Sequence, residues 1–382
     1  MRRFPIARTA FIALFLTVAA LSSFAQQPKV KFTKAFAKAN KGKYHIEVNE
    51  VKELLIIMQA ITDYGLGNDD MFDQEGDYYK EVLAHFKPFK NELIILKMDS
   101  LLKESPLNYI FFTGNSKTYN FDGDTLIPDQ FYLFPAQEVA KVKIDVNPIT
   151  TYKKEIEEFA KKSNFRKFYK DHQPFYEQLY KDYEQKVNLQ KQWRWLENNF
   201  EAKNDSYVIY TSKLINGLNY TTGYNQDGFK LIEMILPAVS VTPGKSEKEL
   251  ESLNTRVMFT EIDHNYVDIP TKKNKNDVEA AFKDRDKWVN KNAYGTAYYP
   301  TGEKVFNEYM TFGVFILYAQ QNWKKDPKLV DEIEKEVNAT MIARGFIKMN
   351  EFTEELKVLY AKNKGKKIDL LYLDLISWCA AQ

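Results

Sequence analysis

The sequence predicts a helix-rich α+β fold with a small, mostly antiparallel sheet. Apolar residues recur at intervals of three and four over residues 50–62, 76–86 and 305–322, a spacing that places them on one face of a helix. The alternation typical of strands is confined to short stretches such as residues 44–48 and 207–211. Helical spacing therefore covers more of the chain than strand spacing does, and we see no internal repeat.

The first residues are typical of a removable export signal. A basic start precedes an apolar run over residues 10–21, and Ser23 and Ala25 are the small residues that signal peptidase reads. We expect cleavage near Ala25, and no lipid anchor because Gln26 follows instead of cysteine. The apolar run is short for a bilayer span, and no other stretch approaches that length. The sequence thus predicts an exported protein, periplasmic or extracellular, with no membrane span in its mature form.

The charge balance and the cysteine count exclude several classes of protein. Loss of the three arginines in the signal changes the formal net charge from +2 to −1. A near-neutral chain lacks the basic footprint of nucleic-acid-binding proteins, so we expect no nucleic-acid partner. Cys379 is the single cysteine, so no intramolecular disulfide can form and the fold must depend on an ordinary core.

These patterns divide the chain into five segments. They are a signal peptide (1–25), a basic, exposed leader arm (26–43), a mainly helical N-terminal part (44–200), a core that holds the candidate site (201–345) and C-terminal helices (346–382).

Three stretches carry weaker local signals. We expect strands and loops over residues 109–146, because aromatic residues are frequent in this stretch and turn residues such as Gly114 and Gly123 interrupt it. Residues 207–211 and 214–224 suggest an antiparallel pair, and residues 271–277 suggest a solvated loop.

The strongest functional signal lies in residues 256–268. A helical face begins with apolar residues upstream and becomes polar at Thr260, Glu261 and His264. Because burial of an unpaired carboxylate is costly, these side chains must find partners. Pro270 is expected to end this helix.

The order Thr260-Glu261-Ile262-Asp263-His264 resembles a zincin motif with one ligand replaced. Zinc peptidases of this class place two histidines at i and i+4 on a helix, with a glutamate after the first as the base. Gluzincins add a glutamate from a later helix, and Glu308 lies in the mostly apolar stretch 305–322. Thr260 stands where the first histidine would be, and its neutral hydroxyl is a poor zinc ligand.

Longer stretches carry a resemblance to one family. Val-Asn-Glu-Val-Lys-Glu-Leu-Leu-Ile-Ile-Met near the start, Tyr-Tyr-Lys-Glu-Val-Leu-Ala-His-Phe-Lys-Pro-Phe further on, the Glu261 helix and Asn-Glu308-Tyr together resemble the uncharacterised secreted bacterial family named domain of unknown function 4932. The resemblance covers nearly all of residues 44–345. It implies a zincin-like, gluzincin-like fold with Zn²⁺ as the cofactor. Glu261 matches the general base, and His264 and Glu308 match metal ligands.

Two functional hypotheses follow. In the first, the protein is an exported metallopeptidase that hydrolyses peptide bonds through a metal-bound water, with Glu261 as base and Tyr298 (or Tyr294 or Tyr299) as donor to the oxyanion. The replacement for the missing ligand is open: it could be water or one of the side chains Asp263, Asp268, His45, His85 and His172. In the second, the protein is a non-catalytic pseudo-peptidase that binds a partner. A peptide or protein is the expected partner in both, and an extended peptide could add to the strands around residues 207–224.

A carboxylate-bridged di-iron site is the other chemistry that uses Glu-x-x-His. It needs this motif twice, and the residues three positions before His45, His85 and His172 are Gly42, Val82 and Tyr169. None of these is acidic, so this class is excluded.

Overall fold

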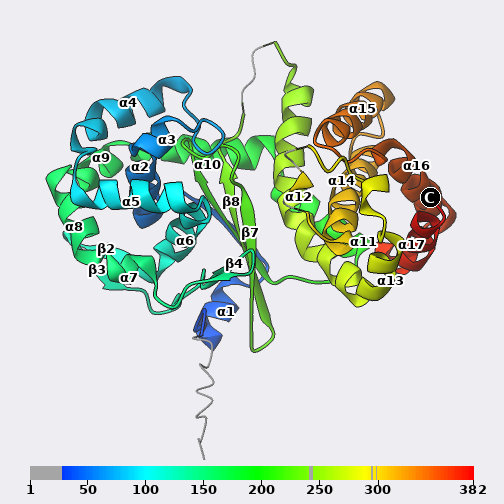
Figure 1. The fold of residues 1–382 in the computed structure, drawn as a ribbon, viewed down its shortest axis with the longest axis horizontal. Coiled ribbons are helices and arrows are strands. Elements are labelled where there is room, and N and C mark those ends of the chain that lie inside the picture. The colour runs from blue at the N-terminus through cyan, green and yellow to red at the C-terminus, as the bar shows by residue number, and fades with distance from the viewer. Residues whose placement is uncertain (1–27, 241–243, 294–295, 298) are drawn as a thin grey trace, which may run out of the picture.

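The structure is a computed structural model that describes residues 28–240, 244–293, 296–297 and 299–382. Helices dominate the described residues and the sheets are small, so the predicted helix-rich α+β class is confirmed (Figure 1). The predicted signal peptide and its cleavage site at Ala25 lie outside the described residues. In the described part of the chain, no helix has the length and apolarity to cross a membrane.

The central feature is a mixed four-stranded sheet. Its order is β1-β6-β8-β7, with bounds Lys43–Glu47, Ser206–Ser212, Phe229–Pro237 and Tyr220–Gln226. β6 runs parallel to both β1 and β8, whereas β7 is antiparallel to β8 and forms one edge. The predicted antiparallel pair between residues 207–211 and 214–224 is therefore wrong, because β8 lies between them. β6 and β8 are buried on both faces, which is the usual environment of parallel strands.

The sheet separates two hydrophobic cores, one on each face. Tyr207 and Ile209 of β6 point into the core shared with the C-terminal helices, and Val208 and Tyr210 point into the core shared with the N-terminal helices. This alternation is the period-two geometry of a strand that is covered on both sides. Figure 1 shows the sheet standing between the two groups of helices.

The N-terminal layer is built around α2 (Glu50–Ala60), which is buried from Val51 onward. The helices around it are α1 (Lys34–Asn40), α3 (Asp63–Leu66), α4 (Gly76–Phe86), α5 (Leu93–Glu104), α6 (Leu107–Asn115), α7 (Pro148–Thr151), α8 (Lys153–Lys162), α9 (Phe165–Asp171) and α10 (Gln173–Lys186). The same layer contains the hairpins β2–β3 (Tyr119–Asp122, Thr125–Pro128) and β4–β5 (Glu138–Val139, Val142–Lys143).

Two predictions for this layer need correction. Residues 109–115, expected as strand or loop, belong to α6, because a short apolar run suits a buried helix as well as a buried strand. Most described residues of the leader arm are exposed, as predicted, but the arm is anchored to the rest of the protein. Phe32 is buried against Phe36 and Tyr132, and Lys31 N–H donates to the Phe131 carbonyl, so an aromatic cluster holds this segment against the sheet.

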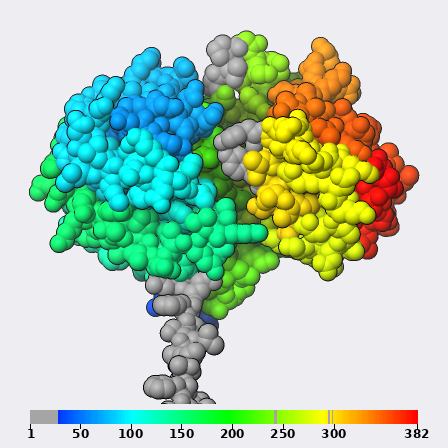
Figure 2. Space-filling view, viewed as in Figure 1, coloured from blue at the N-terminus to red at the C-terminus, as the bar shows by residue number. Residues whose placement is uncertain are grey.

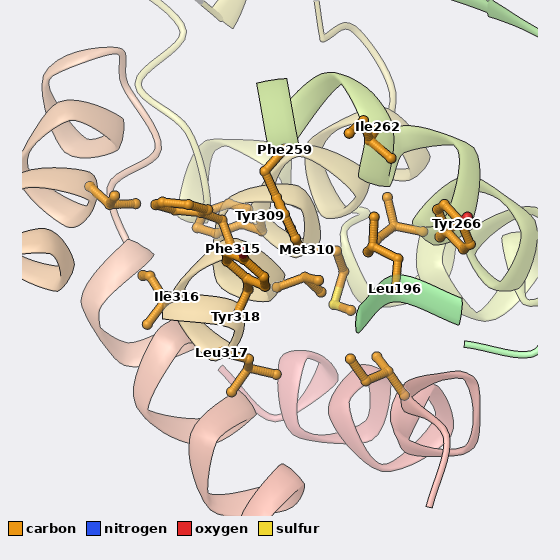
Figure 3. Close-up of a cluster of buried hydrophobic side chains, with 14 of the residues drawn as sticks. Leu196, Phe259, Ile262, Tyr266, Tyr309, Met310, Phe315, Ile316, Leu317 and Tyr318 are labelled. Carbon is orange, nitrogen blue, oxygen red and sulfur yellow. The ribbon is translucent and has the colours of Figure 1, made fainter. Parts of the chain in front are cut away.

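The C-terminal layer is dominated by two long helices, α12 (Glu247–Lys273) and α14 (Gly302–Asn322). Figure 3 shows Phe259, Ile262 and Tyr266 of α12 in one cluster with Tyr309 and other α14 side chains. The remaining helices of this layer are α11 (Leu189–Asn199), α13 (Lys275–Ala281), α15 (Pro327–Ala343), α16 (Met349–Lys362) and α17 (Tyr372–Ala380).

α12 begins at a capping box formed by Ser246 and Glu249 and continues past Pro270. The predicted end at Pro270 and the predicted loop over residues 271–277 are therefore wrong. Pro270 lies in the last turn, where its missing N–H removes only one helical hydrogen bond. The turn is held by the Thr271 hydroxyl, which donates to the Val267 carbonyl at 2.7 Å, and by Asn274 N–H, which donates to the Pro270 carbonyl at 3.1 Å.

Candidate functional site

The predicted site residues surround one pocket of ≈ 390 Å³. Thr260, Glu261 and His264 reach it from α12, and Glu308 reaches it from α14. The apolar stripe of α12 packs against α14, and this packing turns the polar positions on the neighbouring face of the helix toward the pocket. The structure therefore brings Glu261, His264 and Glu308, the three residues that match the motif, to the lining of one pocket. We call this the site pocket.

Arg344, at the C-terminal cap of α15, is the residue that sequence reasoning missed. Its guanidinium donates to Glu308 Oε1 at 2.8 Å and to the Tyr299 hydroxyl at 3.0 Å. Its charged centre lies 5.4 Å from the ring centre of Phe312. Burial opposes the charge of Arg344, but Glu308 and Tyr299 outweigh this effect and raise its pKa. A helix-terminal arginine beside Gly345 has no motif that links it to Glu308, so only the fold reveals the pair.

Thr260 is bonded to its own helix. Its hydroxyl donates to the carbonyl of Arg256 at 3.0 Å and lies 3.3 Å from that of Val257. This back-bonding is common for threonine within helices. It directs the hydroxyl hydrogen to the backbone and leaves no ligand in the place of the first histidine of the zincin motif.

The side-chain carboxylate of Glu261 has no hydrogen-bond or ion-pair partner among the described residues, although its backbone carbonyl accepts from Asn265 Nδ2 at 3.2 Å. Burial raises the pKa of Glu261, the neighbouring His264 lowers it, and the charge of Glu308 raises it. His264 Nδ1 lies 3.3 Å from the Thr311 hydroxyl. No hydrogen bond joins Glu261 to His264 among the described residues, and the Glu261 carboxylate lines the pocket with its acceptor sites open.

The other candidate ligands lie elsewhere. Asp263 is fully buried outside the pocket lining, and burial, followed by the charges of Glu261 and Glu308, raises its pKa well above the ordinary range. Asp268 pairs with Lys272 and Asn307. The remaining histidines bond to other groups outside the pocket: His45 to Asn40, His85 to the Ser163 carbonyl and His172 to Glu81.

The three candidate tyrosines have different outcomes. Tyr298, predicted as the oxyanion donor, and Tyr294 lie outside the described residues. Tyr299 lines the site pocket, and its hydroxyl accepts a hydrogen bond from Arg344. Burial, together with the charge of Glu308, raises the pKa of Tyr299.

The described residues do not fit Zn²⁺. A zinc site needs at least three nitrogen, sulfur or oxygen ligands converging on one point. In the described part of the chain, no three His, Cys, Asp or Glu side chains come close enough together to hold a metal ion. Glu308 is bound by a guanidinium, which already supplies a positive charge at that carboxylate. Thr260 is bonded to its helix, so His264 lacks the partner that the zincin motif would give it.

Two further pockets between the two layers adjoin the site pocket. A second pocket of ≈ 700 Å³ shares Gly217, Asn219, Tyr299 and Arg344 with it. A third pocket of ≈ 370 Å³ shares Asn216 with the second and Val257 with the first. We call the three adjoining pockets the cleft. Figure 2 shows a recess between the N-terminal and C-terminal layers, with green residues of the sheet region at its floor.

A loop held by the N-terminal layer separates the pockets. Residues 213–219 connect β6 to β7, and the N–H groups of Asn216 and Gly217 donate to the carbonyls of Met71 and Asp70 at 3.3 and 2.7 Å. Asn219 Oδ1 is buried and has no hydrogen-bond donor among the described residues. The loop thus presents an open acceptor between the first and second pockets.

The chain matches no protein-family model, no curated protein and no solved structure. The resemblance to the uncharacterised secreted family therefore stays a prediction, and the function must be argued from the cleft itself.

Proposed function

We propose that this protein is a non-catalytic, peptide-binding relative of zincin metallopeptidases, whose cleft holds an extended peptide or protein segment. The observation that carries the proposal is the ion pair between Arg344 and Glu308 at 2.8 Å. In a gluzincin-type site the equivalent glutamate would bind the metal. Here the guanidinium of Arg344 is bound to that glutamate instead. The protein keeps the framework of helices around such a site while its ligand set has been replaced.

The edge of the sheet supports an extended ligand. β7 pairs with β8 on one side, and residues 220–226 form no other backbone hydrogen bond with the described residues. An open edge strand can pair with an added strand, which binds through backbone groups and uses alternate side chains for specificity. β7 begins directly after the loop that forms the wall of the cleft, so a peptide on this edge would run into the cleft.

Peptide binding tests this proposal directly. Short fluorescently labelled peptides of alternating sequence should bind the mature protein and raise its fluorescence anisotropy. They should stay intact after long incubation, as judged by mass spectrometry. The matched probes carry N-methyl groups at alternate backbone nitrogens, which removes the donors that strand addition needs. Equal binding of methylated and unmethylated peptides would contradict edge pairing, and specific cleavage would contradict the non-catalytic proposal.

The convergence of Glu261, His264 and Glu308 on one pocket favours a second candidate, a metallopeptidase. Elemental analysis of protein purified without chelators separates the two. The binding-protein proposal predicts no zinc, both in the native protein and in Glu308→Ala. Near-stoichiometric zinc that is lost in Glu308→Ala would support the peptidase instead.

A double variant tests why the site would lack a metal. If Arg344 and Thr260 are what prevent metal binding, the double variant Thr260→His with Arg344→Met should bind zinc in calorimetry. Thr260→His alone should bind far less, because Arg344 still holds Glu308. No binding by the double variant would mean that α12 and α14 are not arranged as in a zincin.

We also propose that the protein acts outside the cytoplasm. The composition of residues 1–25 supports this proposal. N-terminal sequencing of the protein recovered from the periplasm or medium should begin at Gln26. A cytoplasmic protein that retains its first residues would overturn it.

A further inference from the structure

The cleft combines carboxylates and open acceptors with few available donors. Four acidic side chains that line it form no ion pair with the described residues: Asp70, Asp73, Glu75 and Glu261. Its two arginines are both engaged, Arg344 with Glu308 and Arg256 with Glu336. Lys213 is the one lining lysine, and it has no ion-pair partner among the described residues.

This imbalance indicates the chemistry of the missing partner. Asn219 Oδ1 is buried without a donor between two of the pockets, and Glu261 is half-buried without one. An unsatisfied buried acceptor is costly unless a ligand or water brings an N–H or O–H group. The lining carboxylates without an ion pair outnumber the one lysine without an ion pair, so a ligand that carries positively charged donors would satisfy them best.

The positions of the acids divide into two groups. Glu261 lies in the site pocket on α12, whereas Asp70, Asp73 and Glu75 lie at the other side of the cleft on the segment between α3 and α4. Asp73 and Glu75 are tied together, since Glu75 N–H donates to Asp73 Oδ1 at 2.9 Å. A ligand that meets both groups must extend across the cleft, as an extended peptide does and a small cation does not.

We propose that the cleft selects basic peptide segments, with a lysine or arginine side chain seated on Glu261 and further basic residues facing Asp70, Asp73 and Glu75. This inference rests on the proposed peptide-binding function and adds its specificity. The ammonium or guanidinium group supplies the donors that Glu261 and Asn219 lack. The acidic segment attracts the rest of the peptide through charge complementarity, which favours rapid association and discriminates against acidic partners.

The experiment compares three labelled peptides of equal length in which valine alternates with lysine, glutamine or glutamate. In anisotropy titrations at low salt, the lysine peptide should bind at least about tenfold more tightly than the glutamine peptide, and the glutamate peptide should bind least. The preference should shrink as salt is raised, because exposed charges are screened.

Substitutions in the cleft test which residues cause the preference for the lysine peptide. Glu261→Gln keeps the size of the side chain and removes its charge. It should weaken binding of the lysine peptide by about tenfold, with little effect on binding of the glutamine peptide. The triple variant Asp70→Asn, Asp73→Asn, Glu75→Gln should reduce the salt dependence. The matched control is Glu104→Gln, Glu155→Gln, Glu158→Gln, which removes as many charges from exposed positions outside the cleft and should leave the preference unchanged.

The outcomes separate this inference from the function on which it rests. If all three peptides bind alike, and N-methylation weakens them all, the peptide-binding function stands and the basic specificity is overturned. If no peptide of any charge binds, the proposed function itself is overturned. A loss of preference in the control triple variant would assign the effect to overall charge and overturn the role of the cleft.

Discussion

The two faces of the sheet treat buried carboxylates differently. In the N-terminal core, Glu53 accepts hydrogen bonds from Tyr78 at 2.7 Å and Ser212 at 3.0 Å, and Glu233 accepts from Tyr210 and Tyr224 at 3.4 and 3.3 Å. At the cleft, Glu261 has no donor among the described residues.

Glu308 also lines the cleft, but its carboxylate has a partner, because Arg344 forms an ion pair with it. The contrast teaches which polar groups are structural. Acids surrounded by tyrosine and serine hydroxyls complete a core, whereas an acid left open at a pocket keeps its hydrogen-bonding capacity for a ligand.

The largest expected effect comes from removing the ion-pair partner of Glu308. Arg344→Met should lower the free energy of unfolding by about 3 kcal/mol, because it leaves Glu308 buried and unpaired. Urea denaturation measures this loss. The double variant Arg344→Met with Glu308→Gln should recover most of it, since the isolated charge is then gone. Equal stability of the single and double variants would show that the ion pair does not support the fold.

Glu53, a hydrogen-bonded carboxyl group of the N-terminal core, should make stability depend on pH. Burial raises the pKa of Glu53 to about 7, against the hydrogen bonds from Tyr78 and Ser212 that lower it. The folded state then holds a proton that the unfolded state releases near pH 4.5, so stability falls as pH rises from there to about 7. The slope is at most about 1.4 kcal/mol per pH unit.

Glu53→Gln should flatten this part of the stability profile, because glutamine cannot titrate. Denaturant titrations at several pH values in that window measure the slope. Glu155→Gln, an exposed control, should leave the wild-type slope unchanged. An unaltered slope in Glu53→Gln would mean that another group titrates there.

A smaller change in stability, a gain instead of a loss, is expected for a substitution of Glu261, whose carboxylate has no partner. Glu261→Gln should raise the free energy of unfolding by about 1 kcal/mol at neutral pH, since it removes a half-buried charge without a partner. The same variant should lose the preference for the lysine peptide. Thermal denaturation measures the gain, and a loss of stability would show that Glu261 has a structural partner after all.

The smallest expected effect concerns Tyr299. Tyr299→Phe removes one hydrogen bond to Arg344 and keeps the aromatic ring, so it should lower the free energy of unfolding by about 1 kcal/mol or less. Double-mutant analysis with Arg344→Met should give a coupling of the same size. Full additivity of the two substitutions would mean that the hydrogen bond contributes nothing.

Local sequence patterns predicted the long elements well. α2, α4 and α14 carry the three- and four-residue spacing over enough turns to be distinguished from strands. α6 was missed because Tyr109 to Phe112 is apolar and aromatic throughout, and such a run fits either element when it is buried. β8 carries no alternation for the same reason, since nearly all of it is buried.

The convergence of Glu261 and His264 with Glu308 could be predicted because a known motif gives their spacing. The pairing of Glu308 with Arg344 and the open carboxylates of the cleft could not. These depend on contacts between α14, the end of α15 and the segment before α4, and no local pattern records such contacts. Sequence therefore indicated where the site lies, and three-dimensional packing decided what it can bind.

The register of the sheet also bears on how the chain folds as it is made. Lys43 of β1 is hydrogen-bonded by Ser206, 163 residues later, and β6 in turn needs β8 beside it. The N-terminal helices therefore lack one wall of their core until residue 237 has been synthesised. Pairing over such long separations makes for slow folding, and a nascent chain that ends before β8 would leave unpaired strand edges and apolar side chains exposed. The first half of this protein should thus depend on a chaperone or on rapid completion of synthesis to avoid aggregation.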